Sequence, residues 1–324
     1  MAIIAIIDLG SNSVRMTVSE YHQDGSYRVL ARRQEMVRLS KKMGTHKVLQ
    51  PEAIARTMKA LKSFKTTLKD YPKAQIVAVA TAAVRQASNQ AEFLSCFKEE
   101  LEMDLRVLTG EEEAYYDYVG IVNTLQVPNA LILDTGGASA ELVLVRQNQA
   151  AHVISLPVGA VSISEAYLEK DIISAAGLFQ ASLALRQLFN DVSWLADAKR
   201  LPIIALGGSN RTLAKISRRQ GQDIDLPIHG YHLSSQDAAK IYHSILSKGL
   251  EARKQVPGLA KERADIIVGG LLPLIELSLR LVSQQVIFSQ SGLREGILFE
   301  TIQQQTGHQV VSPEPAAMTV DVDE

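Results

Sequence analysis

The sequence contains a single cysteine, Cys96, and its histidines have no spacing typical of a metal site. One cysteine excludes an intrachain disulfide and any cysteine-based zinc site. Cys96 lies in the stretch "EFLSCFKEEL", whose apolar residues recur at helical spacing. We therefore interpret it as a small core residue rather than as a nucleophile.

The chain also lacks an excess of either charge and a long hydrophobic run. Lys and Arg total 34 against 35 Asp and Glu, so overall charge does not favour nucleic-acid binding and any anion site must be local. No window of about 18 residues is free of charge, so we expect no membrane span. The apolar run 2–7 has no basic region before it and ends in an acid, which predicts a strand and not a signal peptide. We expect a cytoplasmic protein.

Two nucleotide-binding motifs are absent. No glycine-rich turn is followed by Gly-Lys-Ser/Thr, and none reads Gly-x-Gly-x-x-Gly. These absences argue against a P-loop enzyme and against a dinucleotide dehydrogenase. With 324 residues, 46% of them hydrophobic, the chain has the apolar material for about two domains of roughly 150 residues.

The segment "IIDLGSNSVRM" shows the most informative pattern that is present. A continuous apolar strand ends at Asp8, four small residues follow, and an alternating segment then predicts a half-exposed strand. The segment 129–145, "NALILDTGGASAELVLV", repeats this order around Asp134. Two such hairpins at a domain-sized interval indicate an internal duplication.

Strands and helices alternate through the rest of the chain, which predicts an α/β fold in two related halves. Pro51 suits a helix start, 75–84 reads as a buried strand that ends before Arg85, and Thr109 with Glu112 has the spacing of a capping box. Further elements are a helix over 89–102, a strand over 104–108, a strand and helix over 201–217, a helix within 264–281, and a strand and helix over 286–302. The tail contains two prolines and four acids without a period, so we expect it to be disordered.

Three small-residue turns follow apolar strands, and such turns let backbone N–H groups approach phosphate oxygens closely. One glycine-rich turn is most often only a tight turn, but three together favour phosphate binding. The predicted phosphate-binding residues are Gly10, Ser11, Asn12 and Ser13; Gly136, Gly137, Ala138 and Ser139; and Gly207, Gly208, Ser209 and Asn210.

Three acids stand beside these turns. Asp8 and Asp134 end buried strands, where an uncompensated carboxylate is costly, and Glu141 follows on the far side of the second turn. Mg²⁺ takes oxygen ligands from one or two carboxylates and from substrate phosphates. The three acids therefore predict a divalent-cation site. The alternative is that Asp8 and Asp134 only cap their turns by bonding to their own backbone.

Other charged residues have less decisive patterns. If Glu112 belongs to the capping box, Glu111 and Glu113 are left, and a carboxylate at Glu113 is placed to hold a water as general base. Arg85 is suited to bidentate phosphate contact, although a surface role is equally compatible with its position. Two basic groups are interpreted as solvated faces, with a channel for a long polyanion as the alternative: Arg32, Arg33, Arg38, Lys41 and Lys42, and Arg211, Lys215, Arg218 and Arg219.

Six stretches together resemble the exopolyphosphatase/guanosine pentaphosphate phosphatase family: "IIDLGSNSVRM", "VATAAVRQASN", "LTGEEEAYYDYVG", "LILDTGGASAELVL", "ALGGSN" and "SQSGLREGIL". They occur in order over about 3–300. The first hairpin alone resembles the wider actin-like ATPase superfamily. The resemblance implies two actin-like (ribonuclease H-like) α/β domains with an active-site cleft between them. The expected domains are 1–124 with a C-terminal helix over 294–306, then 125–293, with 307–324 as the disordered tail.

The resemblance also implies roles for individual residues. Glu113 matches the family's catalytic glutamate, Arg85 matches its phosphate-binding arginine, and the metal-associated acids fall on Asp134 and Glu141. For Asp8, we expect a role at the metal through water. Glu141 is the rival candidate for the base. The implied cofactor is Mg²⁺ or Mn²⁺.

Two departures from the family pattern affect these expectations. The usual "DIGGGSTE" reads "DTGGASAE" here, with Ala138 in place of a glycine and Ala140 in place of a threonine. We expect weaker or altered metal and phosphate contacts. The chain also resembles the short, two-domain form, without the helical domain of longer members, which implies a preference for short chains.

The expected function is removal of terminal phosphate from inorganic polyphosphate. A 5′-phosphohydrolase of guanosine pentaphosphate (pppGpp), an actin-like kinase, and a non-catalytic (p)ppGpp-binding or scaffold protein are the alternatives. The expected partner is polyphosphate or pppGpp, without nucleic acid or membrane. The sequence leaves a homodimer open and does not determine the oligomeric state.

Overall fold

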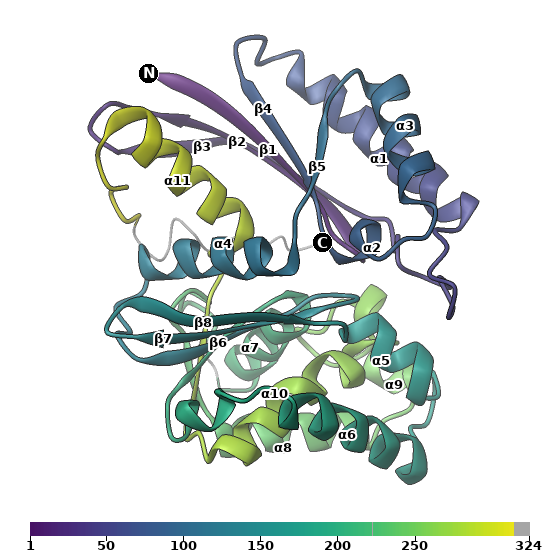
Figure 1. Cartoon of the computed structure of the whole chain (residues 1–324). Coiled ribbons are helices and arrows are strands. Elements are labelled where there is room, and N and C mark those ends of the chain that lie inside the picture. The colour runs from purple at the N-terminus through teal and green to yellow at the C-terminus, as the bar shows by residue number, and fades with distance from the viewer. Residues whose placement is uncertain (222, 314–324) are drawn as a thin grey trace. The chain divides into compact units, whose positions relative to one another are not determined.

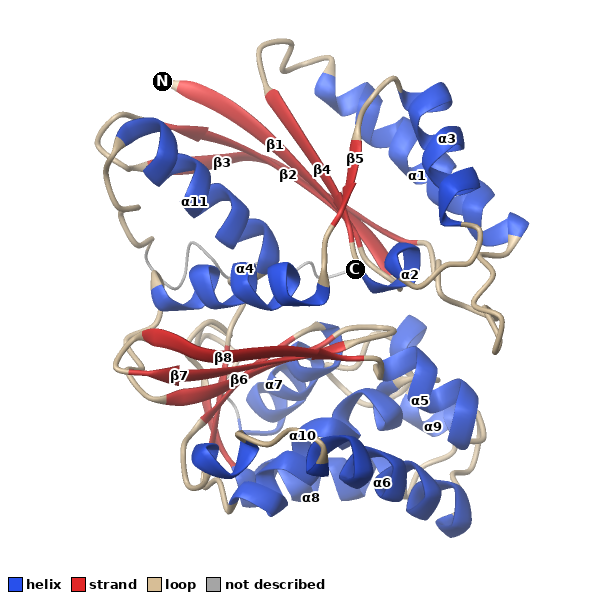
Figure 2. Cartoon of the chain, viewed as in Figure 1, coloured by secondary structure: helices blue, strands red, loops and turns tan. Residues whose placement is uncertain are grey.

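The computed structural model describes residues 1–221 and 223–313, which form two compact units. Unit 1 comprises Met1–Asn123 and Leu293–Ser312, and unit 2 comprises Thr124–Gly292 and, of the remaining described residues, Pro313. Each unit has helices on one mixed sheet (Figure 1 and Figure 2). Of the tail predicted to be disordered, 314–324 lie outside the described residues, whereas the Val311 N–H donates to the Gly25 carbonyl at 3.0 Å.

Unit 1 is built on a five-stranded sheet in the order β3-β2-β1-β4-β5. Its strands are β1 (Ala2–Leu9), β2 (Ser13–Tyr21), β3 (Tyr27–Met36), β4 (Gln75–Ala80) and β5 (Leu105–Val107). Its helices are α1 (Pro51–Leu68), α2 (Ala82–Arg85), α3 (Gln90–Leu101), α4 (Gly110–Val122) and α11 (Leu293–Thr306).

Two hydrophobic clusters cover the two faces of this sheet. Ala5 and Ile7 of β1 belong to the cluster that includes α1 and α3, whereas Ile4 and Ile6 belong to the cluster that includes α4 and α11. Figure 1 shows these two helix pairs on opposite faces. Because successive side chains of a strand alternate between faces, a continuous apolar run fits a strand covered on both sides.

The prediction that the second strand is half-exposed is wrong. In β2, Val14, Met16 and Val18 face the α1 side, and the polar residues between them are buried as well. Thr17 accepts a hydrogen bond from Nη1 of Arg294 at 3.0 Å. The start of α11, far away in sequence, therefore supplies a polar partner on this face.

The strand predicted over 75–84 is shorter than expected. β4 ends at Ala80, and 82–85 form the single-turn helix α2. β1 ends opposite Ala80, so no neighbouring strand continues the ladder. The Arg85 N–H instead donates to the Thr81 carbonyl at 2.9 Å. Arg85 consequently lies at the end of a helix and not of a strand.

Unit 2 repeats the arrangement of unit 1 in a six-stranded sheet of order β10-β11-β9-β6-β7-β8. Its strands are β6 (Ala130–Thr135), β7 (Ala140–Arg146), β8 (Gln149–Leu156), β9 (Ile203–Leu206), β10 (His232–Ser234) and β11 (Gln285–Phe288). Its helices are α5 (Ala160–Tyr167), α6 (Ala175–Asn190), α7 (Gly208–Gly221), α8 (Ser235–Leu246), α9 (Leu250–Arg253) and α10 (Ile267–Leu281), with 3₁₀ turns at Leu195–Ala198 and Lys261–Arg263.

The internal duplication is visible in the strand orders. In each unit three antiparallel strands are followed by two parallel ones, β1-β2-β3 with β4 and β5, and β6-β7-β8 with β9 and β11. The α/β prediction is confirmed. Within the described ranges, no helix combines the length and apolar character needed to cross a bilayer.

Candidate active site

The first predicted phosphate loop connects β1 to β2 in unit 1. The Gly10 N–H donates to the Ser13 carbonyl at 3.1 Å and closes the turn. Asp8 is buried and lies directly opposite Arg15 of β2. Side chains at such cross-strand positions share one face, with Cβ atoms about 5 Å apart. The acid of this hairpin therefore has a cation as its cross-strand neighbour.

The second predicted loop, between β6 and β7 in unit 2, has the same turn. The Gly136 N–H donates to the Ser139 carbonyl at 3.0 Å. Asp134 lies directly opposite Glu141, which is only 1% exposed and accepts a hydrogen bond from Ser155 Oγ at 2.8 Å. This hairpin thus places two carboxylates side by side where the first hairpin has an acid and an arginine.

The pair Asp134 and Glu141 has the donor chemistry of a divalent-cation site. Neighbouring carboxylates repel each other, and the buried Glu141 also loses hydration; a cation offsets both costs. Mg²⁺ and Mn²⁺ suit carboxylate oxygens, and Mg²⁺ keeps further positions for water and substrate phosphates. Among the described residues no three His, Cys, Asp or Glu side chains form a metal-binding group. The pair fits an open site, and Asp8 has no second carboxylate across its hairpin.

The third predicted loop joins β9 to α7. Gly207 has φ +88°, which favours glycine, and a Cβ there would lie 2.6 Å from Oδ1 of Asp134. The amide of Asn210 donates to the Leu206 carbonyl at 2.5 Å and to Thr135 Oγ1 at 3.3 Å. The loop is therefore held against the end of β6, beside Asp134. It also includes the first residues of α7. A helix N-terminus presents unpaired N–H groups, which favour anions.

The backbone carbonyl groups of the first loop accept hydrogen bonds from the segment that follows β3. The Asn12 carbonyl accepts from the N–H groups of Val37 at 3.1 Å and Arg38 at 2.9 Å, and the Ser11 carbonyl accepts from the Ser40 N–H at 2.9 Å. These bonds hold the backbone of the first loop in place.

The second loop is held by the corresponding segment of unit 2. The Gly136 carbonyl accepts from the Ala160 N–H at 2.9 Å, and the Gly137 carbonyl accepts from the N–H groups of Val161 at 2.8 Å and Ser162 at 3.2 Å. In both units the segment that follows the third strand along the chain thus holds the predicted phosphate loop, in unit 2 through the start of α5.

Several side chains of these loops have buried polar atoms without a hydrogen-bond partner among residues 1–221 and 223–313. They are both amide atoms of Asn12, Oγ of Ser209 and Oδ1 of Asn210, which is fully buried. Such atoms cost free energy unless they are satisfied, and each instance calls for an explanation. Phosphate oxygens and their bound water are suitable partners. These atoms therefore support ligand binding at the first and third loops.

Arg85 and Glu113 are brought together in unit 1. Nη1 of Arg85 donates to Oε2 of Glu113 at 2.8 Å and to the Leu108 carbonyl at 2.9 Å. Glu113, in the first turn of α4, is 9% exposed, whereas Glu111 is exposed. Burial thus distinguishes the two glutamates that spacing alone left as candidates.

The predicted capping box at the start of α4 is confirmed. The Glu112 N–H donates to Oγ1 of Thr109 at 3.1 Å, and the Thr109 N–H donates to Oε2 of Glu112 at 2.8 Å. The hydrogen bond from Thr109 holds the pKa of Glu112 below its usual value, and the ion pair with Arg106 acts in the same direction. Glu112 is therefore committed to the helix start.

Comparison with known proteins gives a family. The model of the Ppx/GppA phosphatase family matches residues 18–305. The chain belongs to the Ppx/GppA phosphatase family. It is similar to the Aquifex aeolicus family member, at 27% identity over 94% of this chain and 98% of that one, with a TM-score of 0.76. It is also similar in fold to an exopolyphosphatase from Cytophaga hutchinsonii, at 24% identity over 96% and 100% of the chains, with a TM-score of 0.86.

The structure confirms the prediction of two α/β units with related sheets. It also places the two departures of this Ppx/GppA phosphatase in a structural context. Ala138 is buried within the second loop, and Ala140 is fully buried at the first position of β7, opposite Thr135. Both loops keep the same closing hydrogen bond, so neither alanine prevents the turn from forming.

The sequence analysis missed two residues that contact the third loop from elsewhere in the chain. The guanidinium of Arg263 lies against Gly208, because a Cβ at Gly208 would collide with it. Gly270 of α10 similarly lies against Oγ of Ser209. Both residues are far from the loop in sequence, and no local pattern distinguishes Arg263 from a surface arginine. The loop thus has a nearby cation that the sequence did not reveal.

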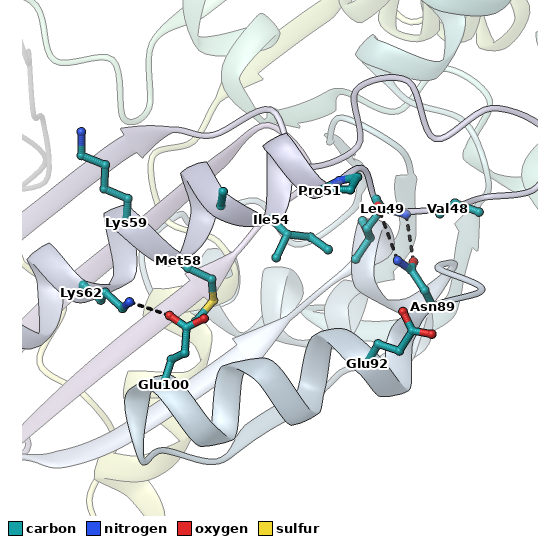
Figure 3. A pocket seen from close by; sticks show the side chains of 11 residues that line it. Val48, Leu49, Pro51, Ile54, Met58, Lys59, Lys62, Asn89, Glu92 and Glu100 are labelled. Atoms are coloured by element: carbon teal, nitrogen blue, oxygen red, sulfur yellow. Dashed lines mark hydrogen bonds and ion pairs between the residues drawn. The ribbon is translucent and has the colours of Figure 1, made fainter.

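A pocket of about 790 Å³ in unit 1 lies apart from all of these residues. Figure 3 shows apolar side chains of α1, including Ile54 and Met58, with Asn89 hydrogen-bonded to the backbone of Leu49 and an ion pair between Lys62 and Glu100. None of the predicted catalytic, phosphate-binding or metal-binding residues lines it. It is not the predicted active site.

Proposed function

We propose that this Ppx/GppA phosphatase is an exopolyphosphatase that releases the terminal phosphate of inorganic polyphosphate. The observation that carries the proposal is the buried Glu113 carboxylate held by Arg85, in a chain with three phosphate-type loops. A non-catalytic binding protein needs no positioned base. The name of the Cytophaga hutchinsonii relative, an exopolyphosphatase, agrees with this substrate class.

In the proposed reaction, Glu113 accepts a proton from a water molecule whose oxygen attacks the terminal phosphorus. The bond between that phosphorus and the bridging oxygen breaks, so the products are inorganic phosphate and a chain shortened by one unit. Arg85 orients Glu113 through the hydrogen bond to Oε2. Positioning and electrostatic stabilisation then account for most of the catalysis, as in other phosphoryl transfers.

The loops bind the phosphates in this proposal. Their N–H groups, together with the side chains of Asn12 and Ser209, contact phosphate oxygens, and Arg263 adds positive charge at the third loop. Asp134 and Glu141 would hold Mg²⁺ or Mn²⁺, which would neutralise phosphate charge. Asp8 lies opposite Arg15 and is assigned a role through water rather than direct ligation.

The deciding experiment is a phosphate-release assay on tripolyphosphate, long polyphosphate and pppGpp, with Mg²⁺ and with a chelator. The wild type should release phosphate from polyphosphate, and Glu113→Gln should lower kcat at least about 100-fold, the usual range for loss of a general base. Glu111→Gln, two residues earlier in the first turn of α4 and exposed, is the matched control and should retain activity.

Glu141→Gln separates the two candidate bases. If Glu141 is a cation ligand, this variant should need a higher Mg²⁺ concentration for half-maximal rate and should recover activity as Mg²⁺ is raised. A fully active Glu113→Gln protein would overturn the assignment of the base. If the wild type releases phosphate from pppGpp and not from polyphosphate, the substrate is the nucleotide.

A further inference from the structure

The segment between β3 and α1, residues 37–50, is a cationic stretch beside the first predicted phosphate loop. It contains Arg38, Lys41, Lys42 and Lys47 and no acidic residue. We call this segment the β3–α1 loop. Among the described residues, Lys41 and Lys47 form no ion pair with an acid, so their charge is not neutralised by the protein.

The β3–α1 loop is fixed to the first phosphate loop. Its Val37, Arg38 and Ser40 N–H groups donate to the carbonyls of Ser11 and Asn12, at 2.9–3.1 Å. Four of its apolar side chains are buried in the core of unit 1, namely those of Val37, Leu39, Met43 and Leu49. The backbone that carries these cations is therefore fixed next to residues expected to contact phosphate.

The backbone of this loop is strained at its basic residues. Arg38, Lys42 and Lys47 have φ of 49°, 60° and 52°, in the left-handed region, as does Gly44 at 61°. Residues with a side chain rarely adopt that conformation, because Cβ comes too close to the following carbonyl oxygen. Strain that persists in a well-anchored loop supports a functional hypothesis for the residues that bear it.

Unit 2 provides an internal comparison. There the corresponding segment, which follows β8 and holds the second phosphate loop, reads "PVGAVSISEAY" from 157 to 167 and contains no Lys or Arg. In unit 2 the predicted phosphate loop is thus held by a segment without a cation. The positive charge of the β3–α1 loop is consequently not required for holding a phosphate loop and needs another explanation.

The positive charge continues onto α1. Nε of Arg56 donates to the Val37 carbonyl at 3.1 Å, and Arg56 is exposed. At its other end the β3–α1 loop leads through Val48 and Leu49 into the wall of the pocket in Figure 3. Cations therefore extend outward from the first phosphate loop over the surface of unit 1.

We propose that the β3–α1 loop, with Arg56, binds inner phosphates of a polyphosphate chain whose terminal phosphate is in the active site, and so selects for chain length. The proposal rests on the proposed function. An inorganic chain is favoured over a nucleic acid because 37–50 contain no Phe, Tyr or Trp on which bases would stack.

The test compares Lys41→Gln/Lys47→Gln with Lys69→Gln/Lys73→Gln, which removes the same charge from the exposed end of α1 and the turn after it. For each protein, kcat/KM is measured on tripolyphosphate and on long polyphosphate. The first variant should lower the long-to-short ratio about tenfold, within the range of electrostatic effects on association. For long chains, the slope of log(kcat/KM) against log[salt] should also be less steep by about 1.4, the value for two lost phosphate contacts to a single strand. The control should keep the wild-type ratio.

An unchanged ratio in Lys41→Gln/Lys47→Gln, or the same decrease in the control, overturns the proposal. Binding of labelled polyphosphate to the Glu113→Gln protein, followed by fluorescence anisotropy, tests the loop without hydrolysis. If the wild type releases no phosphate, the proposed function fails. The loop assignment still stands if Lys41→Gln/Lys47→Gln weakens polyphosphate binding more than Lys69→Gln/Lys73→Gln does. Equal competition by an oligonucleotide of the same charge overturns the preference for an inorganic chain.

Discussion

Arg85 donates one hydrogen bond to Glu113 and another to the Leu108 carbonyl, and in this way it ties the end of α2 to the start of α4. The two side chains are the basic and acidic groups on which the proposed reaction depends. The two residues are 28 positions apart in the sequence. Their contact explains why an arginine that sequence alone leaves ambiguous is assigned a positioning role.

We predict that Arg85→Lys lowers kcat/KM by about 10- to 100-fold and Arg85→Gln by more, because a lysine cannot hold Glu113 and Leu108 in the same geometry. The measurement is phosphate release, combined with a double-mutant cycle. In a Glu113→Gln background the substitution at Arg85 should have little further effect. Independent, additive effects of the two substitutions would show that Arg85 does not act through Glu113.

We predict that Gly207→Ala destabilises unit 2 and impairs cation binding. The new methyl group would collide with the Thr135 carbonyl and lie 2.6 Å from Oδ1 of Asp134, in addition to the cost of a positive φ. The free energy of unfolding in urea should fall by about 3 kcal/mol or more. The control is Gly230→Ala, which also has a positive φ but only an ordinary contact, 3.7 Å from Leu125, and should cost about 1–2 kcal/mol. Equal losses in the two variants would contradict the collision.

We predict that Glu112→Ala lowers the free energy of unfolding by about 1 kcal/mol at pH 7, the usual effect of losing a helix cap. The Thr109 hydrogen bond lowers the pKa of Glu112 in the folded state. The stabilisation is therefore present above the unfolded value of about 4.3 and is lost as pH falls through the lower folded value. The difference from wild type should shrink near pH 3. Glu111→Ala should change stability by only a few tenths of a kcal/mol, and a pH-independent effect of Glu112→Ala would exclude the ionised carboxylate as its cause.

We predict that Cys96 reacts slowly with thiol reagents. Burial and the hydrogen bond from its Sγ to Glu100 Oε1, at 3.1 Å, raise the pKa of the thiol. Because the thiolate is the reactive form, the alkylation rate at pH 8 should be below that of a free cysteine and should still increase above pH 9. Glu100→Gln should accelerate the reaction. Rapid labelling of the native protein at pH 7 would show instead that Cys96 is a reactive thiol.

Features that depend on neighbours in sequence were predictable without coordinates. The capping box of Thr109 and Glu112 spans four residues, and each hairpin turn closes within four residues, so short-range hydrogen bonds determine them. The alternation of strands and helices similarly indicated the α/β architecture. The same reasoning failed for β2, whose polar face is covered by α11 from the other end of the chain.

The sequence by itself determined the family, the three phosphate-type loops and the acids that accompany them, because these features lie in contiguous stretches. Only the tertiary structure decided that Asp134 faces Glu141 whereas Asp8 faces Arg15, that Arg263 lies against Gly208, and that the β3–α1 loop is bonded to the first phosphate loop. Strand register and long-range packing set these contacts. They join residues that no local pattern connects, since side-chain pairing across a sheet depends on which residues stand opposite one another.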